Sequence, residues 1–137
     1  MQKRKFLNIL TGLALVAMSG LTQAQDNSFK VGLILPMSGP FASTGKQLES
    51  AARLYMAQHG DTVAGRKVVL VVKDDTGSPE VTKRIAQELV VNDKVQVLAG
   101  FGLTPLAMAT APVATQSKTP MVVMAAATSI IDRKSVV

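Results

Sequence analysis

The stretch KVVLVVKDDTGSPE, residues 67–80, contains a strand, a turn and the start of a helix in succession. Its first seven residues lack the alternation of a strand that is exposed on one face. Ser78 can cap a helix, Pro79 suits the first helical position, and Glu80 favours the positive end of the helix dipole. This stretch therefore predicts a buried strand that leads directly into a helix.

The segments on both sides of this stretch follow the same order of strand, loop and helix. Further strands are expected at residues 30–35, 95–99 and 121–125, and helices at residues 46–59, 78–91 and 104–117. Strands that are apolar throughout are buried on both faces, as in a parallel sheet covered by helices. Because crossovers between parallel strands are right-handed, the order βαβαβαβ predicts a doubly wound, mainly parallel α/β sheet. Four strands would leave an edge strand unprotected, so we expect this sheet to be incomplete.

Residues 1–24 are predicted to be a signal peptide that is removed when the protein is exported to the periplasm. Basic residues near the start precede an apolar stretch at 6–21, and the small residues Thr22 and Ala24 precede a cleavage site at Gln25. An anchoring transmembrane helix is the alternative. It is less favoured, because polar residues and glycines interrupt the run and it falls short of about 20 strongly apolar residues.

The charge and composition argue against several classes of function. Three of the 15 basic residues and none of the 9 acidic ones lie in residues 1–24, which leaves a net charge of +3 beyond them. With one tyrosine, four phenylalanines and no tryptophan, the chain lacks a stacking platform for nucleic acid. The absence of cysteine excludes disulfides and thiol chemistry. The scattered basic residues therefore predict a solvated surface without a nucleic-acid partner.

The loop at residues 38–46 follows a strand and opens a helix, which is the setting of a phosphate-binding loop. Ligands of open α/β sheets bind at such carboxyl ends of strands. The pattern G-x-x-x-x-G-K-[ST] is not met, because Pro40 occupies the first glycine position and Gln47 replaces the hydroxyl residue that holds magnesium. We therefore do not expect a nucleotide site in this loop.

Two adjacent acids, Asp74 and Asp75, follow the strand at residues 67–73. Paired carboxylates at a strand end could bind magnesium, as in receiver domains, but receivers are cytoplasmic and this chain carries an export signal. The alternative is that Asp75 and Ser78 organise the turn into the next helix while Asp74 is solvated. We favour this structural interpretation.

Small and hydroxyl residues follow the last two predicted strands. Thr104 lies at the start of a helix, and the segment AATS at 126–129 comes directly after a strand, where its small side chains let a ligand approach the backbone. Together they predict a pocket of hydroxyl and amide groups that suits a carboxylate without a basic residue. A plain helix cap is an equally open role for Thr104, and the two roles are compatible.

We find no catalytic set of residues in the sequence. The single histidine, His59, ends a predicted helix away from the carboxyl ends of the strands, so a surface role is expected for it. No serine lies in a G-x-S-x-G elbow, and no Cys, His or carboxylate cluster has metal-ligand spacing. The sequence therefore predicts a protein that is not an enzyme and needs no cofactor or metal.

Three stretches resemble a known family: VGLILPMSGPFASTGKQLESAARLYMAQ (31–58), VVLVVKDDTGSPE (68–80) and AGFGLTPLAMATAPVATQSKTPMVVMAAATSIIDR (99–133). They are similar to the N-terminal lobe of the leucine/isoleucine/valine-binding family, which are periplasmic receptors of ATP-binding-cassette importers. The ordered series of P-x-S-G, the DD turn and A-T-S at matching strand ends is specific. The resemblance implies a two-lobed protein that closes on its ligand by a hinge and then docks on a membrane permease.

The resemblance also implies which residues of this chain contact the ligand. Thr104, Ala127 and Thr128 match the positions that hold the ligand's carboxylate, and Thr44 occupies the place of a residue near the ligand's side chain. Where the family often has serine, this chain has Leu103-Thr104-Pro105, which leaves the donor at that loop open. No cofactor is implied.

The family is more than twice as long as this chain, so we expect residues 25–137 to be the N-terminal part of the first lobe, without the second lobe. The leading hypothesis is a receptor for a small carboxylate, either an amino acid or an aromatic or other organic acid. One alternative is a sensory or regulatory domain of the same fold. Others are a secreted α/β enzyme whose catalytic half is missing, or a truncated product without function.

Overall fold

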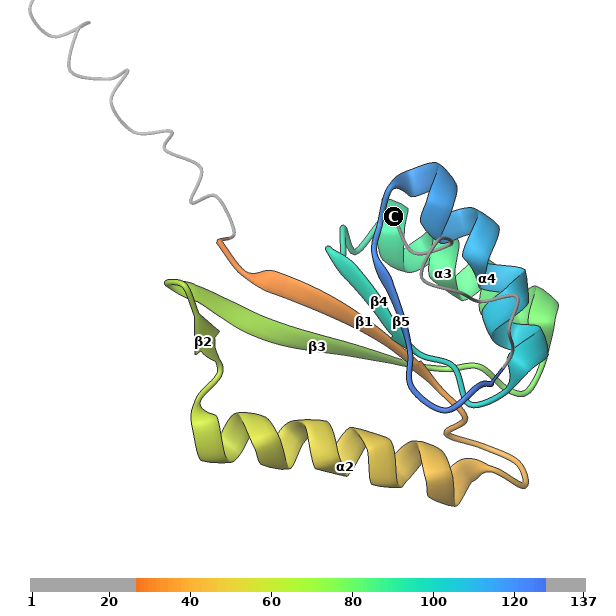
Figure 1. Ribbon diagram of the computed structural model, residues 1–137, viewed down its shortest axis with the longest axis horizontal. Coiled ribbons are helices and arrows are strands. Elements are labelled where there is room, and N and C mark those ends of the chain that lie inside the picture. Colours follow the sequence, from red (N-terminus) through yellow and green to blue (C-terminus); the bar gives the residue numbers. More distant parts are fainter. Residues whose placement is uncertain (1–26, 128–137) are drawn as a thin grey trace, which may run out of the picture.

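The apolar runs of the sequence become the strands of a single sheet in the computed structural model, which describes residues 27–127 (Figure 1). The predicted signal peptide therefore lies outside the described residues. The elements along the chain are β1 (Phe29–Leu35), α2 (Ala42–His59), β2 (Thr62–Val63), β3 (Arg66–Asp74), α3 (Pro79–Val91), β4 (Val97–Gly100), α4 (Thr104–Ser117) and β5 (Met121–Val123). All seven predicted elements are present, with ends that differ by up to four residues.

The strands lie in the order β2-β3-β1-β4-β5. Strand β1 is parallel to both of its neighbours, so that Leu33 is paired with Val72 on β3 and with Ala99 on β4. Strand β5 continues the parallel arrangement beyond β4. The prediction of a doubly wound, mainly parallel sheet is confirmed.

The short antiparallel strand β2 was not predicted. It pairs with the start of β3 through a two-residue turn in which Ala64 and Gly65 both have positive φ, at 50° and 75°. Such turns match the twist of a hairpin and favour glycine. The sequence indicates only the turn at Gly65, because two strand residues are too few to show the alternation of side chains that identifies a strand.

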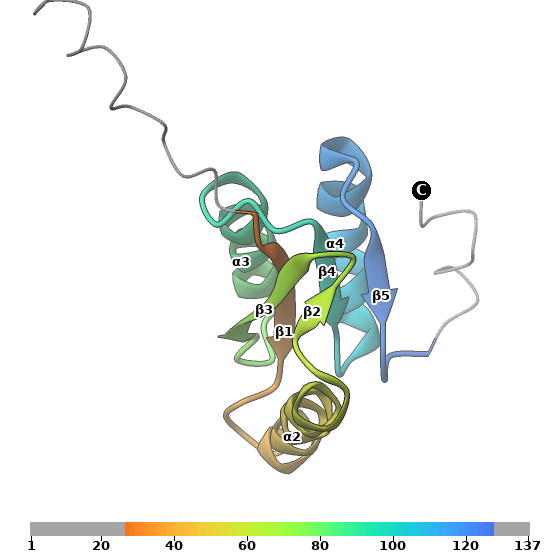
Figure 2. The same cartoon turned by 90° about the vertical axis from the view of Figure 1, so that its left-hand side faces the viewer.

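The helices cover both faces of the sheet (Figure 1). Helices α3 and α4 cover the larger core cluster, to which β1 contributes Ile34 and β4 contributes Leu98. Helix α2 covers the smaller cluster, with Leu48 and Ala52 packed against it. Figure 2, which looks nearly along α2, shows this helix by itself on its side of the sheet. Tyr55, near the end of α2, has a side chain that is 62% exposed.

Helix α2 begins four residues before its predicted start, because Gly45 is tolerated inside it. A glycine normally weakens a helix interior. Here Gly45 is the buried residue of α2, and a Cβ added to it would overlap the carbonyl oxygen of Pro36. The starts of the other two helices were predicted correctly, with Ser78 Oγ accepting a hydrogen bond from the N–H of Val81 at 3.5 Å.

Candidate ligand-binding site

The four parallel strands end at the same edge of the sheet, and the chain leaves two neighbouring strands in opposite directions. After β1 it passes to α2 on one face, whereas after β4 it passes to α4 on the other face (Figure 1). Open α/β sheets bind ligands in the crevice that such a divergence creates. The loops at residues 36–41 and 101–103 therefore border the candidate binding crevice.

The two helices that start beside this crevice lack side-chain caps. The N-cap positions are Phe41 for α2 and Leu103 for α4, and neither helix has an acid in its first turn. By contrast, α3 starts one strand away with Ser78 as its cap and Glu80 in its first turn. The first N–H groups of a helix have no partner within it and carry partial positive charge. The starts of α2 and α4 therefore suit an anion such as a carboxylate.

The structure brings two of the predicted site residues, Thr104 and Ala127, into contact. Thr104 is the first residue of α4, and its hydroxyl donates a hydrogen bond to the carbonyl oxygen of Ala127 at 3.1 Å. The alternative role of Thr104 as the helix cap is wrong, because Leu103 holds that position. A hydroxyl has one proton, so Thr104 can donate to a ligand only after this bond breaks. Thr128 lies outside the described residues.

The remaining predicted residue, Thr44, lies in the first turn of α2 and is exposed. Its N–H donates to the carbonyl oxygen of Phe41 at 3.0 Å. Among the contacts that the structure describes for residues 27–127, none joins Thr44 to Thr104 or Ala127. It stands on the α2 side of the crevice, while the other two stand on the α4 side.

Phe101 was not predicted as a site residue, although its backbone joins the loop after β4 to the end of β1 and to the loop after β5. Its side chain is fully buried, and its φ of +67° is unusual for a bulky residue. Its N–H donates to the carbonyl oxygen of Ile34 at 2.9 Å, and its own carbonyl oxygen accepts from the N–H of Ala126 at 3.0 Å. The only signal in the sequence was its position between Gly100 and Gly102.

The expectation that Asp74 is solvated is wrong. Its Oδ1 accepts hydrogen bonds from the N–H of Met37 at 2.9 Å and of Thr76 at 3.0 Å. Burial tends to raise the pKa of Asp74, but hydrogen bonds from the Ser38 hydroxyl and from the N–H groups of Thr76, Met37 and Ser38 outweigh it and hold the pKa below its usual value. Asp74 therefore remains ionised and connects the loop after β1 to the end of β3.

The structural role predicted for Asp75 is confirmed. The residue is fully buried, and its Oδ1 accepts a hydrogen bond from the N–H of Gly77 at 2.8 Å. Burial raises the pKa of Asp75, and the nearby charge of Asp74 raises it further. The hydrogen bond from Gly77 acts in the other direction and lowers the pKa, but by less.

In residues 27–127 no group of His, Cys, Asp or Glu side chains could hold a metal ion.

His59 lies at the exposed end of α2, as predicted. Its Nδ1 is 3.0 Å from the carbonyl oxygen of Tyr55, and the two rings stack with centroids 4.1 Å apart. His59 is at the end of α2, whereas the candidate crevice lies beside the start of this helix at Phe41.

Within the described part of the chain, none of the helices has the length and apolar character that a membrane crossing demands.

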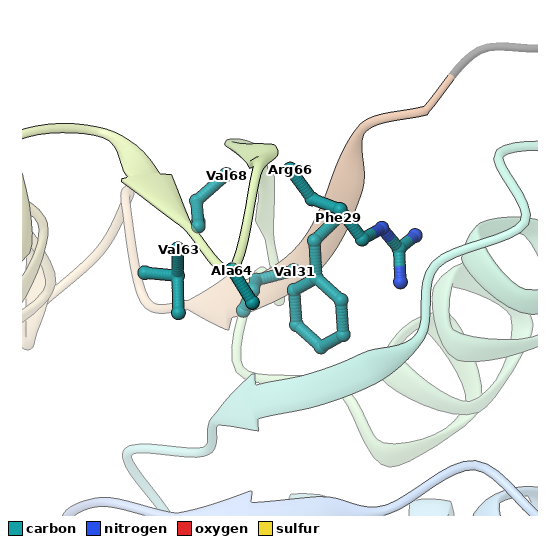
Figure 3. Close-up of a pocket in the computed structure, with 6 residues that line it drawn as sticks. All are labelled: Phe29, Val31, Val63, Ala64, Arg66 and Val68. Carbon is teal, nitrogen blue, oxygen red and sulfur yellow. The ribbon is translucent and has the colours of Figure 1, made fainter.

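An apolar pocket of about 380 Å³ lies at the opposite end of the sheet, where β1 and β3 begin (Figure 3). Its lining residues are Phe29, Val31, Val63, Ala64, Arg66 and Val68. Arg66 donates to the carbonyl oxygen of Ser28 at 2.7 Å, and its guanidinium carbon lies 5.3 Å from the centroid of the Phe29 ring. Because this pocket is at the amino ends of the strands, it is separate from the candidate crevice.

Known sequences share this arrangement of strands and loops. The sequence profile of a family described as "Periplasmic binding protein" matches residues 28–135. The chain belongs to this family. A relative within it, Leu/Ile/Val-binding protein homolog 6 from Brucella abortus, is 46% identical over 127 residues, which are 92% of this chain and 32% of that protein. The chain thus spans about a third of the length of the relatives it matches.

Solved structures of the family show the same fold. A solute-binding protein of an ABC transporter from Rhodopseudomonas palustris BisB5, in complex with 3,4-dihydroxybenzoic acid, is 63% identical with a TM-score of 0.75 and covers 77% of this chain and 29% of its own. Another from R. palustris, in complex with 4-hydroxybenzoate, is 45% identical with a TM-score of 0.72 and covers 74% of this chain and 28% of its own. These relatives are binding proteins, not enzymes, so the predicted family and non-enzymatic class are confirmed.

Proposed function

We propose that this chain forms part of an extracytoplasmic receptor that binds a small aromatic carboxylate of the hydroxybenzoate class and delivers it to the permease of an ABC importer. The observation that carries the proposal is the pair of uncapped helix starts, at Phe41 and Leu103, which follow the two neighbouring strands where the chain diverges. Both favour negative charge at this edge of the sheet. A ligand carboxylate supplies that charge.

The relatives and the crevice both favour an aromatic acid over an amino acid. Two solved relatives at 63% and 45% identity bind dihydroxybenzoate and hydroxybenzoate. The crevice loops carry large apolar side chains, including Phe41, which is 49% exposed, and Met124, which is 43% exposed. The segments 36–41, 101–104 and 124–127 contain no acid that could pair with an ammonium group. Aromatic acids need no such partner.

A branched-chain amino acid is the second candidate. It is favoured by the 46% identical Brucella relative, which is named as a Leu/Ile/Val-binding protein homolog. The same carboxylate site would serve both ligands, because the helix starts contact only the feature that they share. The ammonium group would then need an acid from a part of the protein beyond this chain.

The proposed domain organisation is a signal peptide at residues 1–24 followed by the opening part of a first lobe, with a second lobe supplied by the remaining length of the protein. The ligand would lie between the lobes, which close on it by a hinge. In this arrangement Thr104, Ala127 and Thr128 hold the carboxylate, and Thr44 lies near the ring.

Calorimetric titration of the full-length protein tests the ligand class. We expect 4-hydroxybenzoate and 3,4-dihydroxybenzoate to bind, and the uncharged isostere 4-hydroxybenzamide to bind at least about tenfold more weakly because it lacks the anion. Thr128→Val should weaken binding of the benzoates. Binding of leucine without binding of either benzoate would contradict the aromatic class. Equal affinity for the amide would contradict the carboxylate site.

A further inference from the structure

Asp74 lies at the end of β3, beside the strand that leads into the crevice. Its carboxylate contacts two segments at once. The N–H of Thr76 belongs to its own turn, whereas the N–H of Met37 belongs to the loop after β1, 37 residues away in the sequence. An Asp side chain in a turn commonly hydrogen-bonds the backbone two residues further on, as Asp74 does with Thr76. The contact with Met37 needs another explanation.

We propose that Asp74 is a positioning residue for the crevice, whose charge holds the loop at residues 36–41 in the conformation that the ligand requires. This inference rests on the proposed function. Asp74 does not touch the ligand in this scheme. It acts through the backbone of Met37 and the hydroxyl of Ser38, which lead directly to the uncapped start of α2 at Phe41.

The loop needs such an anchor, because little else holds its outer part. Its base is fixed at Pro36, against which Gly45 and Gly102 pack so closely that an added Cβ would meet it. Beyond Met37 the residues up to Phe41 are exposed. Among the hydrogen bonds described for this loop, those to Asp74 are the ones that join its outer part to a different strand.

The charge on Asp74 matters for the strength of this anchor. A hydrogen bond to an ionised carboxylate is about twice as strong as one between neutral groups. The same hydrogen bonds hold the pKa of Asp74 below its usual value in spite of burial, so the carboxylate is charged at neutral pH. An asparagine keeps one oxygen acceptor without the charge, and an alanine keeps neither.

The test compares Asp74→Asn and Asp74→Ala with the matched control Asp61→Asn in the full-length protein. Asp61 is a partly exposed acid whose Oδ2 lies 3.5 Å from Nζ of Lys67 at the far end of the sheet, so the control removes the same charge away from the crevice. Affinity for 4-hydroxybenzoate is measured by calorimetry, and exchange of the Met37 amide proton by NMR. We expect binding to weaken about tenfold or more in Asp74→Ala and by less in Asp74→Asn, with faster exchange at Met37 in both.

The outcomes separate this inference from the proposed function. A wild-type protein that binds neither benzoate contradicts the proposed aromatic class, and the variants are then compared by their affinity for leucine. Wild-type binding with unchanged affinity in Asp74→Ala overturns the positioning role and leaves the function intact. Weaker binding with unchanged exchange at Met37, or an equal loss of affinity in the Asp61 control, also overturns it. If Asp74→Ala does not fold, the asparagine variant decides by the same two measurements.

Discussion

Replacing Gly45 by alanine tests how closely α2 lies against the loop after β1. An alanine Cβ at this position would overlap the carbonyl oxygen of Pro36, lie 2.7 Å from its carbonyl carbon, and lie 3.2 Å from the sulfur of Met37. The first two contacts are with backbone, which cannot turn aside as a side chain can. To reach the ordinary separation of 3.4 Å from that carbon, the helix must withdraw by at least about 0.7 Å.

Two effects of opposite sign decide the result. In an open helix interior, alanine is more stable than glycine by about 0.5–1 kcal/mol. Overfilling a packed contact costs about 1–3 kcal/mol. Because the contact at Pro36 is with backbone, we expect the second effect to win, with a net loss of about 1–2 kcal/mol in the free energy of unfolding. The retreat of α2 should also weaken ligand binding, since the crevice includes its start.

Guanidinium unfolding of the full-length protein measures this loss, with Ser50→Ala as the control. Ser50 is an exposed residue of the same helix, so its substitution should change stability by no more than about 0.5 kcal/mol. A Gly45→Ala protein that is as stable as the wild type, or more stable, would refute the close approach of α2 to Pro36.

Two further predictions concern Thr104 and Asp75. Thr104→Val removes the hydrogen bond to Ala127 and should weaken benzoate binding about tenfold. Thr104→Ser keeps a hydroxyl and should bind benzoate nearly as the wild type does. Equal affinities of the valine and serine variants in calorimetric titration would argue against a role for the hydroxyl. Burial raises the pKa of Asp75, so ionisation of this carboxyl is unfavourable in the folded state. The stability that the protonated carboxyl contributes to the wild type is therefore greatest below about pH 4. It is lost as the pH rises through the raised pKa. The stability of Asp75→Asn relative to wild type should therefore increase with pH across this range, and a flat difference in unfolding free energy would contradict the buried charge.

Much of the fold was predictable because its determinants are local. The apolar run at residues 67–73 predicts a buried strand, and Ser78 with Pro79 predicts the helix start that the structure shows. Thr104 and Ala127 were both predicted at the carboxyl edge, because each lies within a few residues after a strand. Their contact at 3.1 Å follows from the parallel order of β4 and β5.

The errors arose where distant segments meet. Asp74 was expected to be a solvated turn residue, because the sequence does not reveal that the N–H of Met37 donates to its Oδ1 at 2.9 Å. The predicted helix start at residue 46 leaves Gly45 in the preceding loop, whereas the structure places Gly45 inside α2 and against the carbonyl of Pro36. Tyr55 falls on the same helical face as Leu48 and Ala52 by periodicity, but its side chain is 62% exposed.

The order of strands and helices along the chain, the parallel sheet and the edge at which we propose that a ligand binds could all be predicted from the amino-acid sequence. These follow from runs of apolar residues and from caps, which act over a few neighbouring positions. The tertiary structure was needed to show that β1 and β4 are neighbours at which the chain diverges, that the helices after both strands start without side-chain caps, and that Asp74 accepts a hydrogen bond from the loop after β1. Each of these depends on groups far apart in the chain, whose contact is set by the packing of the whole sheet.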